Sequence, residues 1–292
     1  MKIYFIVKPI KSSLRKRLLS AIEATLGGDK YSYRILDSLK KGHAIELTEE
    51  AIARNASLIV ACGGDGTINE VARGLVNSGI PLGIIPLGSG NGIARHFNIP
   101  FQLDKAIALI KKNPSSKMDV GVMNGQYFFG NMGCALESHF IKHYQKKGWH
   151  GLGAYFIAFF MAILNFRHQK IKIEYNQKIQ EICPFLFLIS NTNQQGYNLT
   201  ITPDAKTDDG QLDLFFMDNS NVIKKLKFMI FTLFRKKWKT PQITRALFSE
   251  MKITKGFEGN FCVQLDGEYT PISNESIEIK VLPKKLNVIL PH

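Results

Sequence analysis

The residues best suited to chemistry in this sequence lie in two glycine-rich segments, GGDGT at Gly63–Thr67 and GSGN at Gly88–Asn91. Each segment follows a short apolar run and opens a helical pattern. Glycine lets the backbone come close to a ligand, and the first N–H groups of a helix have no partner inside the helix. Phosphate fits at such a place. One glycine loop is most often only a tight turn, whereas two in tandem indicate a phosphate-binding site.

Acidic residues occur at three places that suit phosphoryl transfer: Asp65, the turn Asp208–Gly210, and the triplet Asp266–Glu268 (DGE). The reaction requires charge neutralisation, positioning, and a base for the acceptor hydroxyl. Asp65 suits a site that also holds Mg²⁺, or one where a hydroxyl is deprotonated. The triplet follows an apolar run, Phe261–Leu265, and Asp-Gly is also a frequent hairpin turn. The residues alone therefore leave both readings of the triplet open.

The segments that position the glycine loops alternate between strand and helix patterns. Four short apolar runs predict strands, at Lys2–Val7, Tyr31–Leu36, Leu58–Cys62 and Leu82–Pro86. This alternation predicts an α/β domain with a parallel sheet that is covered on both faces. Ligands of such sheets bind at the carboxyl ends of the strands. We therefore expect Lys8–Ser12, Ser38 and the two glycine loops along one edge.

From Lys117 onward strand patterns dominate, which predicts a second, mainly antiparallel β domain. We expect the first domain to span residues 1–121 and the second to span 122–283. Further strands are expected at Lys117–Val122, Gln126–Met132, Ile171–Tyr175, Ile179–Ser190, Gln211–Met217, Glu250–Thr254, Asn260–Leu265 and Ser276–Val281. Two helical stretches interrupt them. Ala154–Phe166 predicts a buried helix or the wall of a lipid-tail pocket, and Val222–Lys239 predicts a core helix or a basic, aromatic membrane-surface helix.

The composition indicates the class of partner. The chain has 292 residues and a net charge of +14, which favours nucleic acid or an anionic membrane surface. No nucleic-acid-binding module is recognisable, so we expect no nucleic acid and favour the membrane. Four widely spaced cysteines indicate neither a metal site nor a disulfide framework. Met1–Ile10 shows no signal peptide and the longest apolar run is too short to span a bilayer. We therefore expect a cytoplasmic, peripherally membrane-associated protein.

The motifs GGDGT with Asn69-Glu70, PLGSGN at Pro86–Asn91 and the DGE triplet resemble the diacylglycerol kinase and sphingosine kinase catalytic-domain family. The resemblance covers nearly the whole chain. It implies an ATP-dependent lipid kinase, with a C-terminal tail at about 284–292 that returns to the first domain. It implies a catalytic role for Asp266, Glu268 and Asp65. It implies ATP binding by Lys8, Pro9, Ser12, Ser38, Gly63, Gly64, Asp65, Gly66, Thr67, Asn69, Glu70, Gly88, Ser89, Gly90 and Asn91. It also implies a structural Mg²⁺ on Asp209 and the carbonyls of Lys206 and Gln211.

Two departures from the family pattern concern ligands. The first loop usually carries Asn-Pro, and here it reads Lys8-Pro9. Diacylglycerol-kinase-like members carry Asp where this chain has Gly92, so the acceptor is either a glycerolipid or a long-chain amino alcohol. Two other functions stay open: a soluble small-molecule kinase such as NAD kinase, and a nucleotide-binding regulator without catalysis. A homodimer is compatible with the sequence.

Overall fold

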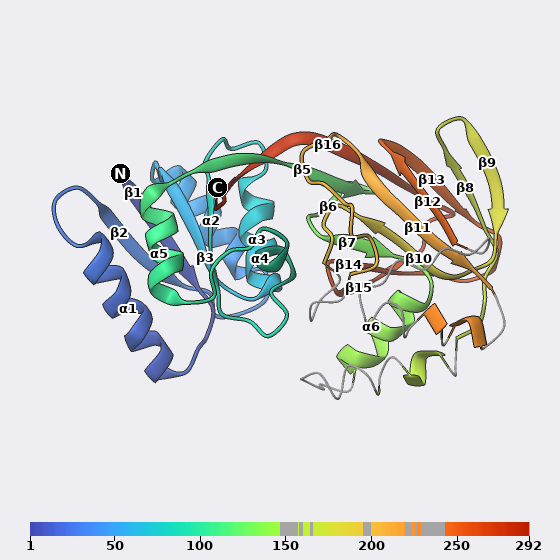
Figure 1. Ribbon diagram of the computed structural model, residues 1–292, viewed down its shortest axis with the longest axis horizontal. Helices are drawn as coiled ribbons and strands as arrows, with labels where there is room; N and C mark the ends of the chain where they lie inside the picture. The colour runs from blue at the N-terminus through green and yellow to red at the C-terminus, as the bar shows by residue number, and fades with distance from the viewer. Residues whose placement is uncertain are drawn as a thin grey trace. The chain divides into compact units, whose positions relative to one another are not determined.

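The computed structural model describes residues 1–146, 157, 160–163, 166–194, 200–219, 223–225, 227–228 and 243–291. The chain divides into two compact units: unit 1 is Met1–Asp119 with the C-terminal segment from Lys284, and unit 2 is Val120–Pro283. The chain enters unit 2 within strand β5 (Ser115–Met123) and returns within strand β16 (Ser276–Ile289) (Figure 1). Unit 1 is α/β and unit 2 is mainly antiparallel β, so the predicted fold class is confirmed.

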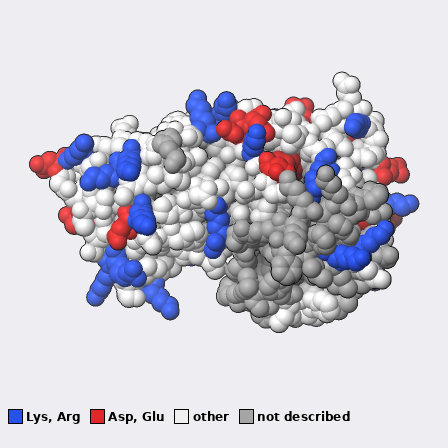
Figure 2. Space-filling model, viewed as in Figure 1, with Lys and Arg blue, Asp and Glu red and all other residues white. Residues whose placement is uncertain are grey.

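Figure 2 shows the charged side chains of the described residues on one face of the molecule. On the face that Figure 2 shows, Lys and Arg side chains are scattered among uncharged atoms, with Asp and Glu side chains between them. The described Lys and Arg side chains on this face therefore do not form a single patch.

Unit 1 is a parallel sheet in the order β2-β1-β3-β4-β16, with helices on both faces (Figure 1). Its elements are β1 (Lys2–Val7), α1 (Ser12–Leu26), β2 (Ser32–Asp37), α2 (His43–Ala53), β3 (Leu58–Gly63), α3 (Asp65–Leu75), β4 (Leu82–Pro86), α4 (Gly92–His96) and α5 (Leu103–Lys112). The central strands β3 and β4 are buried along their whole length, as strands covered on both faces require.

The core of unit 1 forms because strands and helices both present apolar residues to the space between them. Ile3 and Phe5 of β1 pack with Leu18 and Ile22 of α1 and with Ile107 of α5. The helical residues recur at the four-residue spacing that places them on one face. This packing fixes the strands, and the strand ends in turn fix the loops that follow them.

Unit 2 contains two sheets. Six strands pair in the order β12-β11-β10-β7-β14-β15, and β16, β13, β8 and β9 pair as neighbours in the other sheet, where β5 pairs with β16 and β6. The further elements are β6 (Gln126–Phe128), β7 (Asn131–Gly133), α6 (Leu136–Lys146), β8 (Ile171–Tyr175), β9 (Lys178–Ile182), β10 (Pro184–Ser190), β11 (Leu212–Asp218), β12 (Ile243–Phe248), β13 (Glu250–Lys255), β14 (Phe261–Leu265) and β15 (Glu268–Ile272).

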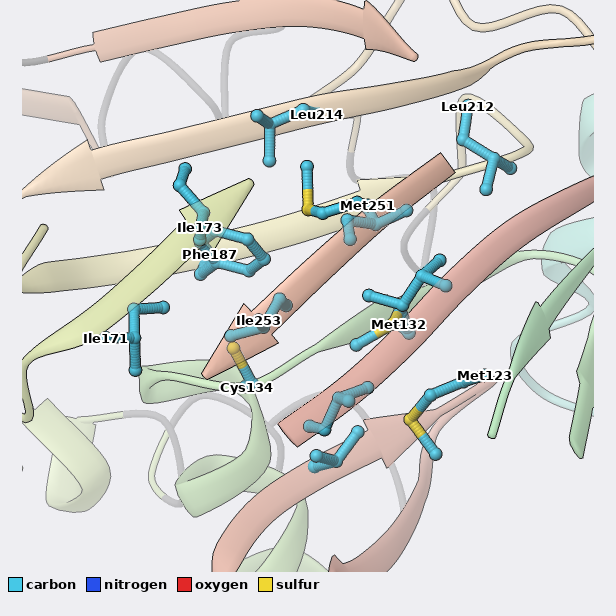
Figure 3. Packing of buried hydrophobic residues seen from close by; sticks show 14 of the residues in the cluster. Met123, Met132, Cys134, Ile171, Ile173, Phe187, Leu212, Leu214, Met251 and Ile253 are labelled. Atoms are coloured by element: carbon cyan, nitrogen blue, oxygen red, sulfur yellow. The ribbon is translucent and has the colours of Figure 1, made fainter. Parts of the chain in front are cut away.

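The core of unit 2 lies between the two sheets. Phe187 from β10 and Leu214 from β11 pack in one cluster with Ile173 from β8 and Ile253 from β13 (Figure 3). Residues on the other face of β10, such as Leu188, pack instead against α6 in a second cluster. All seven residues of β10 are therefore buried, because both faces of this strand are covered.

Two predicted strands are each broken into two in the structure. The segment predicted as Gln126–Met132 forms β6 and β7, and the segment predicted as Ile179–Ser190 forms β9 and β10. Both breaks occur where the chain leaves one sheet for the other. The apolar pattern continues across each break and so does not reveal it. Strands β12 and β15 were not predicted. Most of Ala154–Phe166 and Val222–Lys239 lies outside the described residues.

Candidate active site

The loops of unit 1 that carry the predicted ATP-binding residues meet at one edge of its sheet. The N–H of Lys8, after β1, donates to the carbonyl of Cys62 at 3.2 Å, and the N–H of Ser38, after β2, donates to the carbonyl of Val7 at 2.9 Å. The N–H of Leu87 donates to the carbonyl of Gly63 at 2.7 Å. These hydrogen bonds continue the pairing of the sheet beyond its strands, so the loops that follow all four strands lie at the same edge.

The two glycine loops touch through their backbones. A Cβ atom added to Gly64 would lie 3.1 Å from the Cα of Gly88, and one added to Gly88 would lie 2.5 Å from the Cα of Gly64. The Nζ atom of Lys8 lies 3.8 Å from the position of that added Cβ on Gly64. Glycine is therefore required at both positions for this close approach, and an ammonium group lies beside it.

Asp65 joins the first glycine loop to the second. Its Oδ1 accepts a hydrogen bond from the N–H of Ile93, at the start of α4, at 3.4 Å. Burial raises the pKa of this carboxyl group, and hydrogen bonds from the backbone at Ile93, Gly92 and Asn91 oppose that rise. The carboxylate is thus directed at the first N–H groups of a helix, where negative charge is favoured.

Asn91 and Glu70 also shape the loops with their side chains. The Oδ1 of Asn91 accepts from the N–H of Gly88 at 3.0 Å, and its Nδ2 donates to the carbonyl of Gly88 at 2.7 Å. Glu70 accepts from the N–H groups of Gly42 at 2.8 Å and Ala44 at 3.1 Å, which caps the start of α2. Glu70 therefore ties the loop after β2 to α3.

The remaining predicted ATP-binding residues differ in exposure. The side chain of Thr67 folds against Gly63. Asn69 is buried, and its Oδ1 atom has no hydrogen-bond partner among the described residues. Pro9 and Ser12 are exposed, and Ser12 begins α1. Gly66, Ser89 and Gly90 complete the two loops.

The DGE triplet of unit 2 forms the turn of the β14–β15 hairpin. Asp266 and Gly267 have φ angles of 49° and 82°, the pattern of a two-residue turn with both central residues left-handed. Leu265 pairs with Glu268 across the hairpin. The turn is held from one side by Gln264, whose Oε1 accepts from the N–H of Gly267 at 2.8 Å. The hairpin interpretation of the triplet is thus confirmed by the backbone.

The Asp266 side chain binds the segment between β6 and β7. Its Oδ1 accepts from the N–H groups of Gly130 at 2.7 Å and Asn131 at 3.0 Å, and its Oδ2 accepts from the N–H of Phe129 at 2.9 Å. The Asp266 N–H donates to the carbonyl of Asn131 at 2.8 Å. The carboxylate therefore fixes the sharp turn where the chain passes from one sheet to the other. Glu268 begins β15 beside it.

Glu137 is a partly buried acidic residue whose backbone contacts the sequence reasoning missed. It lies in the first turn of α6, where its Oε1 accepts from the N–H of Phe187 at 2.7 Å and its Oε2 accepts from the N–H of Ala135 at 3.2 Å. Burial raises the pKa of this carboxyl group to about 8, while these backbone hydrogen bonds oppose the rise. In the sequence, the only feature that pointed to Glu137 was its position just after the Asn131–Gly133 strand.

The segment predicted to hold a structural Mg²⁺ concentrates negative charge. The Oδ1 of Asp209 accepts from the N–H of Gln211 at 3.1 Å. The pKa of Asp213 is raised to about 6, first by burial and then by the charges of Asp209 and Asp204. A cation would offset this repulsion, so the donor set fits Mg²⁺, which prefers oxygen ligands. Among the described residues, no three His, Cys, Asp or Glu side chains are grouped as a metal site.

Part of the basic, aromatic stretch packs within unit 2. Phe228 is buried and stacks on Phe215, with ring centroids 5.7 Å apart. The Nζ atom of Lys225 lies 4.5 Å from the ring centroid of Phe185 and 3.3 Å from the Nε2 of His168. Ile223, in contrast, is 65% exposed. In the parts of the chain that are described, no helix has the length and apolar character needed to cross a membrane.

Comparison with known proteins identifies the family. Residues 2–123 match the family described as the diacylglycerol kinase catalytic domain. Residues 141–290 match the YegS C-terminal NAD kinase beta sandwich-like domain. A diacylglycerol kinase of Bacillus subtilis (strain 168) is 30% identical over 233 residues, which cover 78% of this chain and 76% of that protein. A diacylglycerol kinase of Staphylococcus haemolyticus (strain JCSC1435) is 28% identical over 260 residues, which cover 88% and 78%.

A solved structure supports the same assignment. A Bacillus anthracis (strain Sterne) protein, described provisionally as a diacylglycerol kinase, superposes with a TM-score of 0.80 at 26% identity, covering 99% of this chain and 97% of that one. The sequence resemblance to this family is thereby confirmed. The chain belongs to the diacylglycerol kinase family and is a kinase whose phosphate acceptor is an alcohol group.

Proposed function

We propose that the protein transfers the γ-phosphate of ATP to the hydroxyl group of a lipid at a membrane surface. The acceptor is diacylglycerol-like or sphingoid-like, and the names of the relatives favour the glycerolipid. The observation that carries this proposal is the contact between Gly64 and Gly88, because it brings together two strand–loop–helix units whose glycine loops suit phosphate binding. A family match alone would not assign these residues to ATP.

Unit 1 binds ATP in this proposal. The N–H groups of the glycine loops and of the start of α3 bind phosphate oxygens, and the glycines allow the backbone to approach them. Asp65 and Asn91 hold the two loops in register with each other. Mg²⁺ bound together with ATP would supply the remaining charge neutralisation that phosphoryl transfer requires.

Unit 2 supplies the base for the acceptor. As the lipid hydroxyl oxygen forms its bond to the γ-phosphorus, the bond from phosphorus to the bridging oxygen of ADP breaks, and the hydroxyl proton passes to a carboxylate. Glu268 and Asp266 are the candidates. The Asp266 oxygens already accept three backbone hydrogen bonds, which assigns Asp266 at least a positioning role beside Glu268.

A structural Mg²⁺ is part of the proposal. Asp209, with the backbone carbonyls of Lys206 and Gln211, would hold the ion, and the ion would offset the charge that Asp213 and Asp209 place together. The parent protein should then melt at a higher temperature in Mg²⁺ than in a chelator. The same comparison for Asp209→Asn should show little difference, and an equal gain in both proteins would exclude this site.

One experiment separates the proposed function from its competitors. The pure protein is incubated with radiolabelled ATP and Mg²⁺, in parallel with a total lipid extract and with NAD, and the labelled products are separated. Label in a lipid supports the proposal and identifies the acceptor. Label in NAD alone favours the small-molecule kinase, which the second family match suggests. Glu268→Gln serves as the matched control, because it should bind ATP and label neither acceptor at the parental rate.

A further inference from the structure

We propose that Lys8 binds the phosphates of ATP through its ammonium group and so supplies a positive charge that the usual Asn of this loop does not. This inference rests on the proposed ATP site. The sequence departs from the family pattern at this position, and the structure places the altered side chain beside the contact between the two glycine loops.

The backbone fixes Lys8 at the site. Lys8 directly follows β1, the second strand of the parallel sheet order, and its N–H donates to the carbonyl of Cys62 in the neighbouring strand β3. The side chain is partly buried and reaches across the end of β3 to Gly64. An ammonium 3.8 Å from where a Cβ of residue 64 would lie is within reach of any oxygen that binds the N–H groups of this loop.

Three other charged groups of this edge already have partners. Asp65 accepts from the start of α4, and Glu70 caps the start of α2. Arg95 donates from Nε to the carbonyl of Gly90 at 3.0 Å, and its guanidinium lies 4.8 Å from the ring centroid of Phe101. The Lys8 ammonium makes no hydrogen bond or ion pair with any residue that the structure describes. It lies beside the contact of the two glycine loops and is available to a ligand there.

An ammonium in this position distinguishes nucleotides by their phosphates. Hydrogen bonds between charged groups contribute more than neutral ones, and Lys acts on phosphate as a point charge. The contribution depends on the phosphate chain and not on the base or ribose. Loss of the charge should therefore weaken ATP binding strongly and leave adenosine binding unchanged.

The test compares Lys8→Asn, which restores the uncharged residue of the family, with Lys8→Arg, which keeps the charge. Lys105→Asn, at an exposed position in α5 of the same unit, removes an equal charge away from the loops. ATP and adenosine affinities are measured by calorimetry, and each variant is checked by thermal melting. We expect Lys8→Asn to weaken ATP binding by about tenfold to about a hundredfold. Adenosine affinity should stay at the parental value, and Lys8→Arg should retain most of the ATP affinity.

Each outcome bears on one claim. Parental ATP affinity in Lys8→Asn overturns the role of Lys8, and so does an equal loss for ATP and adenosine. If the parent binds ATP but Lys8→Asn does not weaken it, the proposed function stands without this inference. If the parent itself binds no ATP, the proposed ATP site fails, and the role of Lys8 fails with it. An equal effect from Lys105→Asn would show a general charge effect and would also overturn the specific contact.

Discussion

Three acidic residues of the candidate site, Asp65, Glu70 and Asp266, use their carboxylates to accept hydrogen bonds from backbone N–H groups of another segment. Each one fixes a loop that carries further site residues. Their residue type at these positions could be read from the motifs. Their partners could not, because a motif gives the spacing along one segment and says nothing of the segment that folds against it.

At the residue scale, Gly64→Val should abolish ATP binding. The first side-chain atom would already lie 3.1 Å from the Cα of Gly88, so the two further methyl groups would push the glycine loops apart. The comparison is Gly66→Ala, because a Cβ on Gly66 meets nothing within 4 Å and Ala is a better helix residue by roughly 0.5–1 kcal/mol. Both variants are melted and titrated with ATP. Parental ATP affinity in a folded Gly64→Val protein would remove the basis for the assignment.

A second prediction separates Asp266 from Glu268. Asp266→Asn keeps one acceptor oxygen and places an NH₂ group against backbone N–H donors, so it should destabilise the fold by roughly 1–3 kcal/mol. Glu268→Gln should change stability little and lower turnover by about 10²–10⁴-fold if Glu268 is the base. ATP affinity should stay near the parental value in both, whereas Asp65→Ala should weaken it.

The measurements are chemical denaturation, ATP titration and the lipid phosphorylation rate for the three variants side by side. Near-parental turnover in Glu268→Gln together with a large loss in a folded Asp266→Asn protein would transfer the role of base to Asp266. Near-parental turnover in both would place the base outside this hairpin.

At the element scale, the parallel strands and their helices were predictable because each one carries its own signal. The runs Lys2–Val7 and Leu82–Pro86 match β1 and β4 residue for residue. The break at Phe129-Gly130 was not predicted, because both sheets of unit 2 bury apolar residues and the chain stays apolar as it changes sheet. The break at Cys183 had one signal, because Pro184 favours the first position of a strand over its interior. Strand β15 was missed because Glu268–Ile272 shows no alternation and contains Pro271.

Helix α6 provides a prediction for pH. The folded-state pKa of Glu137 is about 8, well above the 4.5 of an ordinary Glu. Between these values the folded protein binds a proton that the unfolded chain releases, so the free energy of unfolding should fall as pH rises from about 5 to about 8. Above that range Glu137 is ionised in both the folded and the unfolded state, so its titration lowers the free energy of unfolding no further. Urea denaturation at pH 5, 7 and 9 measures this slope.

Glu137→Gln provides the control for that slope. The amide cannot ionise, so its stability should lose the pH dependence that the parent shows. Its Oε1 can still accept from the N–H of Phe187, while the contact to the Ala135 N–H is lost at every pH. An equally steep fall in the parent and the variant would mean that another group titrates.

At the scale of the whole molecule, two units joined through β5 and β16 carry different parts of the proposed chemistry. The antiparallel class of unit 2 could be predicted from the sequence, whereas the contacts of the Lys225 side chain within unit 2 could not. Its ammonium lies over Phe185, and burial lowers the pKa of Lys225. A basic residue in a stretch predicted to face a membrane can therefore belong to the fold, and only contacts distinguish the two roles.

Binding to anionic membranes is the prediction that belongs to this scale. Each basic residue near such a surface contributes about 1 kcal/mol, so neutralising Lys224, Lys236 and Lys237 together should weaken vesicle binding by about a hundredfold. Raised salt should weaken parental binding as well, because it screens the attraction. Lys225→Gln is the internal comparison, since its ammonium packs over Phe185 and its loss should lower stability more than binding. Sedimentation with vesicles of anionic and of neutral lipid measures all three proteins, the triple variant, Lys225→Gln and the parent. Equal binding of the triple variant and the parent, or a parent that binds neither kind of vesicle, would mean that this stretch does not bring the kinase to its lipid.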